Sequence, residues 1–142
     1  MSRRKAREIV LCLVFEKDYR KDQSCEKLYE YLFEELSEDL FEKEEINKSD
    51  GEYIKSTFTG VFEHIEQIDD IVAGSMIGWE YNRISKISMA LLRTAVYEML
   101  YAGDIPTSVA INEAVELSKR YDDPDAYSFI NGVLGAVVKN NK

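Results

Sequence analysis

Apolar side chains recur at helical spacing through most of this 142-residue sequence. The run from Ile9 to Phe15 is almost continuously apolar, and a helix that is apolar around most of its circumference has to be surrounded by other helices. Ser2 stands before this run, where its hydroxyl can accept a hydrogen bond from a backbone N–H of the first turn. We therefore predict a central helix over residues 2–17.

The next segment predicts a second helix followed by a solvated stretch. After a polar connection over residues 19–24, Leu28 and Leu32 belong to one apolar stripe at helical spacing, which places a helix over residues 24–36. Residues 34–45 hold seven acidic side chains, one lysine and no sustained periodicity. We interpret them as a solvated loop or a frayed helix rather than as a metal or partner site.

Ser49 and Glu52 have the spacing of a capping box, in which the serine hydroxyl and the glutamate carboxylate each accept from a backbone N–H. This motif predicts a helix that begins at Ser49, keeps an apolar face through Ile68 and continues after a bend to Met76. His64 is the only histidine. It has no second metal ligand or nucleophile near it in the sequence, so we interpret it as a residue of the helix surface.

The second half of the chain predicts three more helices. The segment over residues 89–100 is too apolar for a surface helix, so Arg93 within it needs a carboxylate or carbonyl partner to offset its desolvation. Pro106 is well placed to begin the next helix, and Pro124 ends it. The last helix is expected from residue 125 or 126 to residue 138.

These segments together predict an all-α protein of about seven helices in a single domain over residues 1–142. Gly74 and Gly78 mark the change between its halves. We predict an N-terminal helical subdomain over residues 1–78 and a C-terminal one over residues 79–142.

The composition narrows the class of protein. Hydrophobic residues make up 45% and charged residues 32% of the chain, and the net charge is -9. This acidic surplus opposes non-specific binding to nucleic acid, because the summed field repels phosphates. The apolar run is broken by Glu16, and no segment is long enough to span a bilayer. Since Glu8 also follows the basic start at once, we expect no signal peptide, no membrane contact and a cytoplasmic location.

The first residues reverse this negative charge locally. Arg3, Arg4, Lys5 and Arg7, here called the basic head, stand within five positions of one another. At about 100° per residue, the three arginines fall within about one third of the helix circumference, while Lys5 points away. The helix N-terminus adds further positive potential. The head fits either an RNA-binding patch or a merely solvated terminus.

Other candidate chemistry is weak. Cys12 and Cys25 have no histidine neighbours, so we interpret them as reduced, buried or half-buried thiols rather than zinc ligands. No nucleophile, set of metal ligands or Gly-rich phosphate loop accompanies the pairs at residues 112–113 and 131–132. We expect these pairs to bridge helices by hydrogen bonds, with Gly132 permitting close helix approach. No catalytic residue, cofactor or metal is expected.

Four separated segments resemble the family of the bacterial antitermination factor NusB. They are Arg3-Arg4-Lys5-Ala6-Arg7-Glu8, Leu92-Arg93-Thr94-Ala95-Val96-Tyr97-Glu98, Ile105-Pro106 with Val109 to Leu117, and Phe129-Ile130-Asn131-Gly132-Val133-Leu134. They occur in the same order and with similar spacing as in the family. The resemblance implies an all-helical fold of two three-helix subdomains crossed by a further helix.

The resemblance also implies a function. Members bind the boxA element of ribosomal RNA leader transcripts as a heterodimer with the ribosomal protein also called NusE. They act with RNA polymerase and other Nus factors, and they catalyse no reaction. Carried over by position, the RNA-binding residues are Arg3, Arg4, Arg7, Phe15, Asp125 and Phe129. From the sequence alone, core packing stays an alternative for both phenylalanines.

The resemblance places the partner-binding residues on the helix that faces NusE, at Ser88 and Glu98. Many relatives carry an acidic residue where Ser88 stands, so the contact is expected to be weaker or rebuilt here. Two other functions remain as alternatives. One is a helical scaffold or homodimer that binds only protein. The other is an enzyme, because similar domains precede RNA cytosine methyltransferases, but the chain has no Gly-rich cofactor loop and no catalytic cysteine motif.

Overall fold

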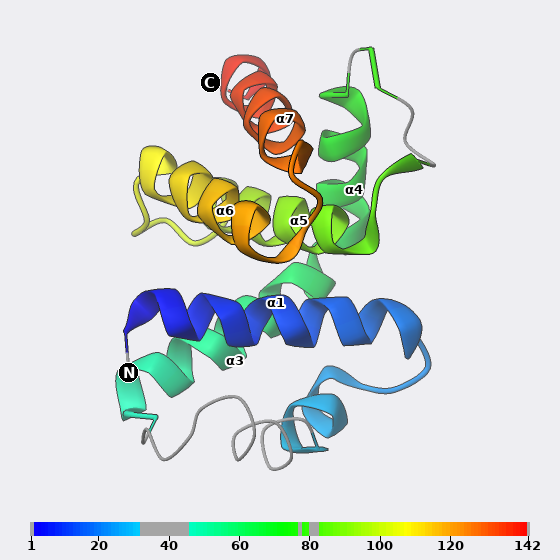
Figure 1. Cartoon of the computed structure of the whole chain (residues 1–142). Coiled ribbons are helices and arrows are strands. Elements are labelled where there is room, and N and C mark those ends of the chain that lie inside the picture. Colours follow the sequence, from blue (N-terminus) through cyan, green and yellow to red (C-terminus); the bar gives the residue numbers. More distant parts are fainter. Residues whose placement is uncertain (1, 32–45, 77, 80–82, 142) are drawn as a thin grey trace.

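The computed structural model describes residues 2–31, 46–76, 78–79 and 83–141, and its regular structure there is helical throughout (Figure 1). The helices are α1 (Arg3–Tyr19), α3 (Lys48–Glu63), α4 (Ile65–Gly74), α5 (Lys86–Leu100), α6 (Thr107–Tyr121) and α7 (Ala126–Asn140). Residues 25–31 are also helical. The prediction of an all-α fold with about seven helices is confirmed. The predicted acidic stretch over residues 34–45 lies wholly outside the described residues, as does the end of the helix predicted over residues 24–36.

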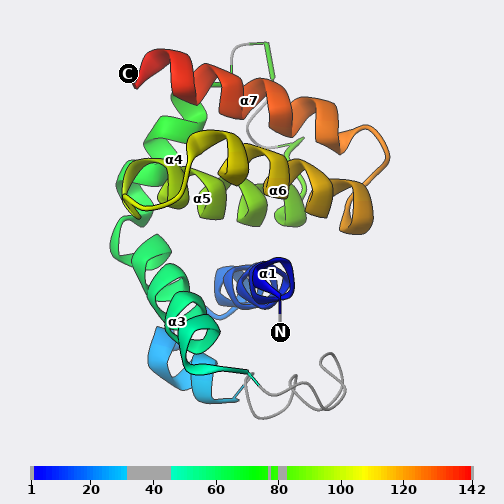
Figure 2. The ribbon, with the colours of Figure 1, turned by 90° about the vertical axis from the view of Figure 1, so that its left-hand side faces the viewer.

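The helices form two groups that meet at α1 and α5. Figure 1 shows α1 and α3 below, with α4, α5, α6 and α7 above them, and Figure 2 shows α7 stacked over α6 on the side away from α1. α5 contacts every other labelled helix. The chain passes from the lower to the upper group near His64, earlier than residue 78. The division into subdomains at residue 78 stays a prediction.

Helix α1 lies at the centre of the core, as its apolar run predicts. Its inner face carries Ala6, Val10 and Val14, none of which has measurable exposure. These side chains pack in one cluster with the buried faces of α3, α5 and α7, including Phe58, Leu92 and Ile130. At roughly 25 cal/mol for each Å² of apolar surface removed from water, this burial is what holds the helices together.

The beginnings of α1 and α3 differ in how well the sequence predicted them. The Ser2 hydroxyl accepts from the Lys5 backbone N–H at 3.1 Å, which confirms the predicted cap of α1. The predicted capping box at Ser49 is wrong, because α3 begins at Lys48 and Asn47 caps it, accepting from the Asp50 N–H at 2.8 Å. Asparagine is as good an N-cap as serine and stands two residues earlier. The Ser49 hydroxyl accepts from an arginine instead.

Arg93 has the carboxylate partners that its burial requires. Its Nε and Nη2 donate to Asp69 at 2.8 and 3.0 Å, and its Nη1 donates to Asp18 at 3.1 Å. The Lys86 ammonium pairs with the same Asp18 at 2.8 Å. We call these four residues the Arg93 network. It joins α1, α4 and α5, and the structural role predicted for Arg93 is confirmed.

A glycine sets the distance between α3 and α5 at one point. A Cβ built on Gly60 would lie 2.3 Å from the ring of Tyr97, well inside the contact distance, so any other residue at position 60 would require that ring to move. Close approach was predicted for Gly132 instead, and that prediction is wrong. A Cβ there would meet nothing within 4 Å, because Gly132 is on the exposed side of α7.

The bend in the long predicted helix occurs at His64, between α3 and α4. The imidazole is half-buried and stacks on the ring of Tyr101, with 4.1 Å between ring centres and 12° between their planes. His64 is therefore a junction residue that packs against the end of α5, rather than a residue of a continuous helix surface.

Candidate nucleic-acid interface

The basic head forms the first turns of α1, where the Ser2 cap fixes the start of the helix. Its arginines reach different neighbours: Arg3 reaches α3, Arg7 reaches α5 and Arg4 reaches α6. The head therefore sits where four helices meet.

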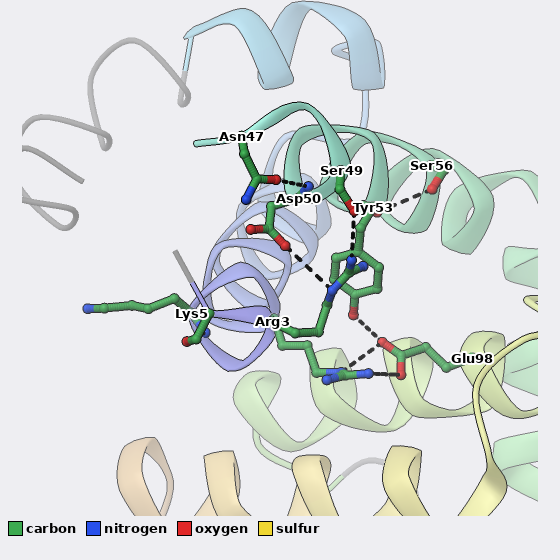
Figure 3. A network of polar contacts seen from close by, with 10 residues as sticks. Arg3, Lys5, Asn47, Ser49, Asp50, Tyr53, Ser56 and Glu98 are labelled. Atoms are coloured by element: carbon green, nitrogen blue, oxygen red, sulfur yellow. Dashed lines mark hydrogen bonds and ion pairs between the residues drawn. The ribbon is translucent and has the colours of Figure 1, made fainter. Parts of the chain in front are cut away.

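Arg3 lies against the first turn of α3 (Figure 3). Its Nη2 donates to the Ser49 hydroxyl at 3.2 Å, and its Nε lies 3.5 Å from the Asp50 carboxylate. The guanidinium carbon is 4.3 Å from the centre of the Tyr53 ring, a cation–π distance. The Arg3 side chain is 42% exposed while that of Asp50 is 6% exposed. A buried carboxylate thus holds the guanidinium of Arg3, while part of the arginine side chain remains open to solvent.

Arg7 is enclosed, although it belongs to the same basic head. Its side chain is 9% exposed, and its Nε and Nη2 each donate to the Glu98 carboxylate at 3.2 Å. The Tyr53 hydroxyl donates to the same carboxylate (Figure 3). Burial and the Glu98 charge raise the pKa of Tyr53 far above its usual range, so the phenol keeps the proton that it donates. Arg7 therefore joins α1 to α5.

Arg4 is the most exposed arginine of the head, at 54% of its side chain. Its Nε and Nη2 donate to the two oxygens of Glu113 on α6, at 3.0 and 3.1 Å. The Glu113 side chain is only 14% exposed. A second pair, between Arg120 and Glu8, also links α6 to α1. The helix-bridging role predicted for residues 112–113 is confirmed for Glu113.

The head is much closer to electrical balance than its sequence indicates. Its four cations, Arg3, Arg4, Lys5 and Arg7, each lie within 4.0 Å of a carboxylate: Asp50, Glu113, Glu8 and Glu98 respectively. Sequence reasoning did not connect these carboxylates or Tyr53 with the head, because all but Glu8 stand on distant helices. No local pattern marks such long-range partners.

The aromatic residues of the predicted interface lie in two separate clusters. Phe15 is half-buried on α1, with its ring centre 5.2 Å from that of Tyr19. Phe129 is 9% exposed on α7 and packs edge-on against Trp79 at 4.8 Å, while Trp79 itself is 53% exposed. Core packing, the alternative for both phenylalanines, accounts for most of their surface.

The remaining predicted residues have contrasting positions. Asp125 is exposed immediately before α7. Ser88 and Glu98, predicted to bind a partner, are 3% and 2% exposed. The Ser88 hydroxyl donates to Asp122, and Glu98 accepts from Arg7. Both side chains are thus engaged inside this chain.

Other classes of site are not evident in the described part of the chain. Cys12 and Cys25 are free and half-buried, and burial raises the pKa of Cys12 to about 11, which keeps its thiol protonated and unreactive. Among the described residues, no three His, Cys, Asp or Glu side chains are grouped so as to hold a metal ion. None of the helices found there has the length and apolar character needed to cross a bilayer.

Comparison with known sequences gives matches over almost the entire chain. The NusB family matches residues 4–139. The transcription antitermination protein NusB of Acetivibrio thermocellus is 43% identical over 139 residues, covering 98% of this chain and 90% of that protein. A protein of the same name from Clostridium perfringens is 39% identical over 144 residues and is covered over its full length.

Comparison with solved structures agrees with the sequence matches. T. maritima NusB superimposes with a TM-score of 0.83 at 31% identity, covering 98% of this chain and 92% of that one. A chain in a crystal structure of the antitermination factors NusB and NusE in complex with double-stranded RNA gives a TM-score of 0.82 at 27% identity, with 97% and 96% covered. These proteins are antitermination factors rather than enzymes. The chain therefore belongs to the NusB family of transcription antitermination proteins.

Proposed function

We propose that this chain binds boxA-type single-stranded leader RNA through its basic head, together with NusE as partner. The observation that carries the proposal is the display of Arg3 and Arg4, 42% and 54% exposed, at the start of α1 in a chain of the NusB family. Arginine forks bind phosphate oxygens bidentately, and guanidinium planes stack on unpaired bases. The N-terminus of α1 adds its own positive potential beside them.

The surface is proposed to continue along α1 and onto α7. Phe15 and Asp125 have accessible surface for contact with a strand, and splayed bases stack on aromatic rings. Phe129 is nearly covered, so its contribution is to support the exposed ring of Trp79. Arg7 contributes by holding the head against α5, because its guanidinium already pairs with Glu98.

The proposed partner rests on the structural neighbour in which NusB and NusE are found together with RNA. Ser88 and Glu98, assigned to this contact from the family resemblance, are buried here. We therefore propose that they shape α5 for the partner rather than touch it. A cytoplasmic location and assembly with RNA polymerase and other Nus factors complete the proposal.

A gel-shift titration with boxA-type RNA, with and without NusE, tests this function. The variant Arg3→Ala/Arg4→Ala/Arg7→Ala should bind RNA more weakly. Its log–log salt slope should fall by roughly 0.7 for each phosphate that the variant no longer neutralises. Because Arg7 is buried, Arg3→Ala/Arg4→Ala serves as a second variant that keeps the α1–α5 contact.

The control is Lys27→Ala/Lys55→Ala/Lys139→Ala, which removes the same charge from exposed positions outside the head. If this control lost as much RNA affinity, net charge alone would explain the effect. Unchanged RNA binding in both arginine variants would contradict the proposal that the basic head is the RNA-binding site. NusE binding without an RNA shift at any salt would favour the protein scaffold, and light scattering with and without RNA would identify a homodimer. Running single- and double-stranded RNA side by side tests the preference for a single strand.

A further inference from the structure

We propose that Glu113 sets the RNA affinity of the basic head by occupying Arg4 in the free protein, so that an RNA phosphate has to replace this carboxylate. The inference rests on the proposed function, since it concerns the same surface. It assigns an affinity-determining role to a residue of α6 that faces the head.

The first argument is the geometry of the pair. Glu113 accepts from Nε and Nη2 of Arg4 at 3.0 and 3.1 Å, which is the bidentate arrangement of an arginine with a carboxylate. The same edge of the guanidinium binds a phosphate bidentately. While Glu113 holds this edge, Arg4 cannot offer it to RNA.

The second argument is which partner is able to move. Glu113 is 14% exposed and stands on α6 beside Ala110, Ala114 and Leu117, where it lines a small cavity shared with α1 and α5. Arg4 is 54% exposed in the first turn of α1 and has a long side chain. The carboxylate is therefore the fixed member and the arginine the one that exchanges.

The third argument is what Glu113 retains after the exchange. Arg7 lines the same cavity, where burial lowers its pKa and the nearby carboxylates of Glu98 and Glu113 raise it. A carboxylate that releases Arg4 still lies in the field of this second cation, which lowers the cost of the exchange. The Arg7–Glu98 pair is buried on both sides and should stay closed.

The experiment measures binding of a fluorescent boxA-type RNA to Glu113→Gln and to wild type by anisotropy over a range of salt. Glutamine is nearly isosteric with glutamate but cannot form the charged pair. We therefore expect RNA to bind about two- to fivefold tighter, which corresponds to the free energy of an exposed ion pair. The gain should shrink as salt rises, because the missing pair is itself screened.

Glu116→Gln is the matched control, since it removes the same charge one turn along α6 from a side chain paired with Lys119. It should give a smaller gain than Glu113→Gln. In an Arg4→Ala background, Glu113→Gln should give no larger gain than Glu116→Gln gives in the wild type. Glu113→Asp keeps the charge but shortens its reach, so it should also tighten RNA binding. It replaces Glu113→Gln if the glutamine variant folds poorly.

The possible outcomes separate the inference from the function on which it rests. Equal or weaker binding by Glu113→Gln, or an equal gain in Glu116→Gln, would overturn the role of Glu113 and leave RNA binding intact. The same holds if the full gain of Glu113→Gln persists without Arg4. A wild-type protein that binds no boxA-type RNA with or without NusE would overturn both.

Discussion

The basic head and the Arg93 network are built from the same pairs of arginine and carboxylate, yet they differ in which partner is covered. In the Arg3–Asp50 and Arg4–Glu113 pairs the arginine is exposed, at 42% and 54%, and the carboxylate is shielded. In the Arg93 network the arginine is shielded, at 11%, and its two carboxylates come from different helices. The first arrangement displays a positive charge, and the second uses one to join helices.

This difference shows that the residue types of an ion pair do not determine its role; the exposure of each partner does. A shielded arginine with two carboxylates costs stability when it is removed, because buried negative charges are left without a partner. Removing an exposed arginine also leaves a shielded carboxylate without this partner, but only one, and the pair that is lost was already weakened by solvent and salt, so the cost to stability is smaller. Arg7 belongs to the basic head by its position in the sequence, but it is shielded like Arg93. It therefore tests whether burial or position determines the contribution of an arginine to stability.

The largest effect is expected for Arg93→Ala. Removing this guanidinium leaves Asp18 and Asp69 without their main partner between α1, α4 and α5, and the free energy of unfolding should fall by about 5 kcal/mol. Urea denaturation measures the change. Arg20→Ala breaks an exposed ion pair between the residue that follows α1 and Glu16 on α1. It should cost about 0.5 kcal/mol or less. Equal losses in the two variants would contradict the comparison.

Arg7→Ala should rank next, with a loss of about 3 kcal/mol in the free energy of unfolding. The loss is smaller than for Arg93 because a single carboxylate, Glu98, is stranded, and because Tyr53 still donates to it. Arg3→Ala should cost under about 1 kcal/mol by the same urea measurement. If Arg7→Ala were as mild as Arg3→Ala, burial would not distinguish the members of the head.

The smallest of the three effects is expected for Asp18→Asn, at about 2 kcal/mol near neutral pH. Burial opposes ionisation of Asp18, but hydrogen bonds from Lys86 and Arg93 outweigh it and lower the pKa of this carboxyl below 3.8. Asp18 therefore stabilises the fold above that value, and the contribution is lost as the pH falls through the lowered pKa.

The difference between wild type and Asp18→Asn should accordingly be smaller at about pH 3 than at about pH 7 in urea denaturation, with the whole change falling below about pH 4. Asp22→Asn, in the exposed turn after α1, is the matched control and should have little effect at either pH. A gap between wild type and Asp18→Asn that stays constant with pH would mean that the charge of Asp18 does not support the network.

Local signals in the sequence predicted most of the fold. The apolar run of α1, the cap at Ser2 and the need of Arg93 for a carboxylate all follow from residues within a few turns of one another. The start of α3 was misplaced because Asn47 and Ser49 are equally good caps by residue type, and the hydroxyl of Ser49 accepts from Arg3, which is far away in the sequence. Helix class is a local property, whereas the choice between close alternatives is made by tertiary contacts.

The candidate site was predictable only in part for the same reason. The sequence located the arginines, and the family resemblance supplied Phe15, Asp125 and Phe129. Nothing in the local pattern could indicate that Arg4 is held by Glu113 or Arg7 by Glu98, since 109 and 91 positions separate the partners. How much of the head's charge is available depends on these partners.

The contact between Gly60 and Tyr97 has a consequence for the evolution of this chain. Because a single methyl group at position 60 would enter the space of the Tyr97 ring, the two positions are not free to mutate independently. Relatives that carry alanine at 60 should carry a smaller side chain at 97, and the stack of position 97 on Tyr101 should disappear with it. Covariation of positions 60 and 97 among relatives would then indicate how closely α3 approaches α5 in each of them.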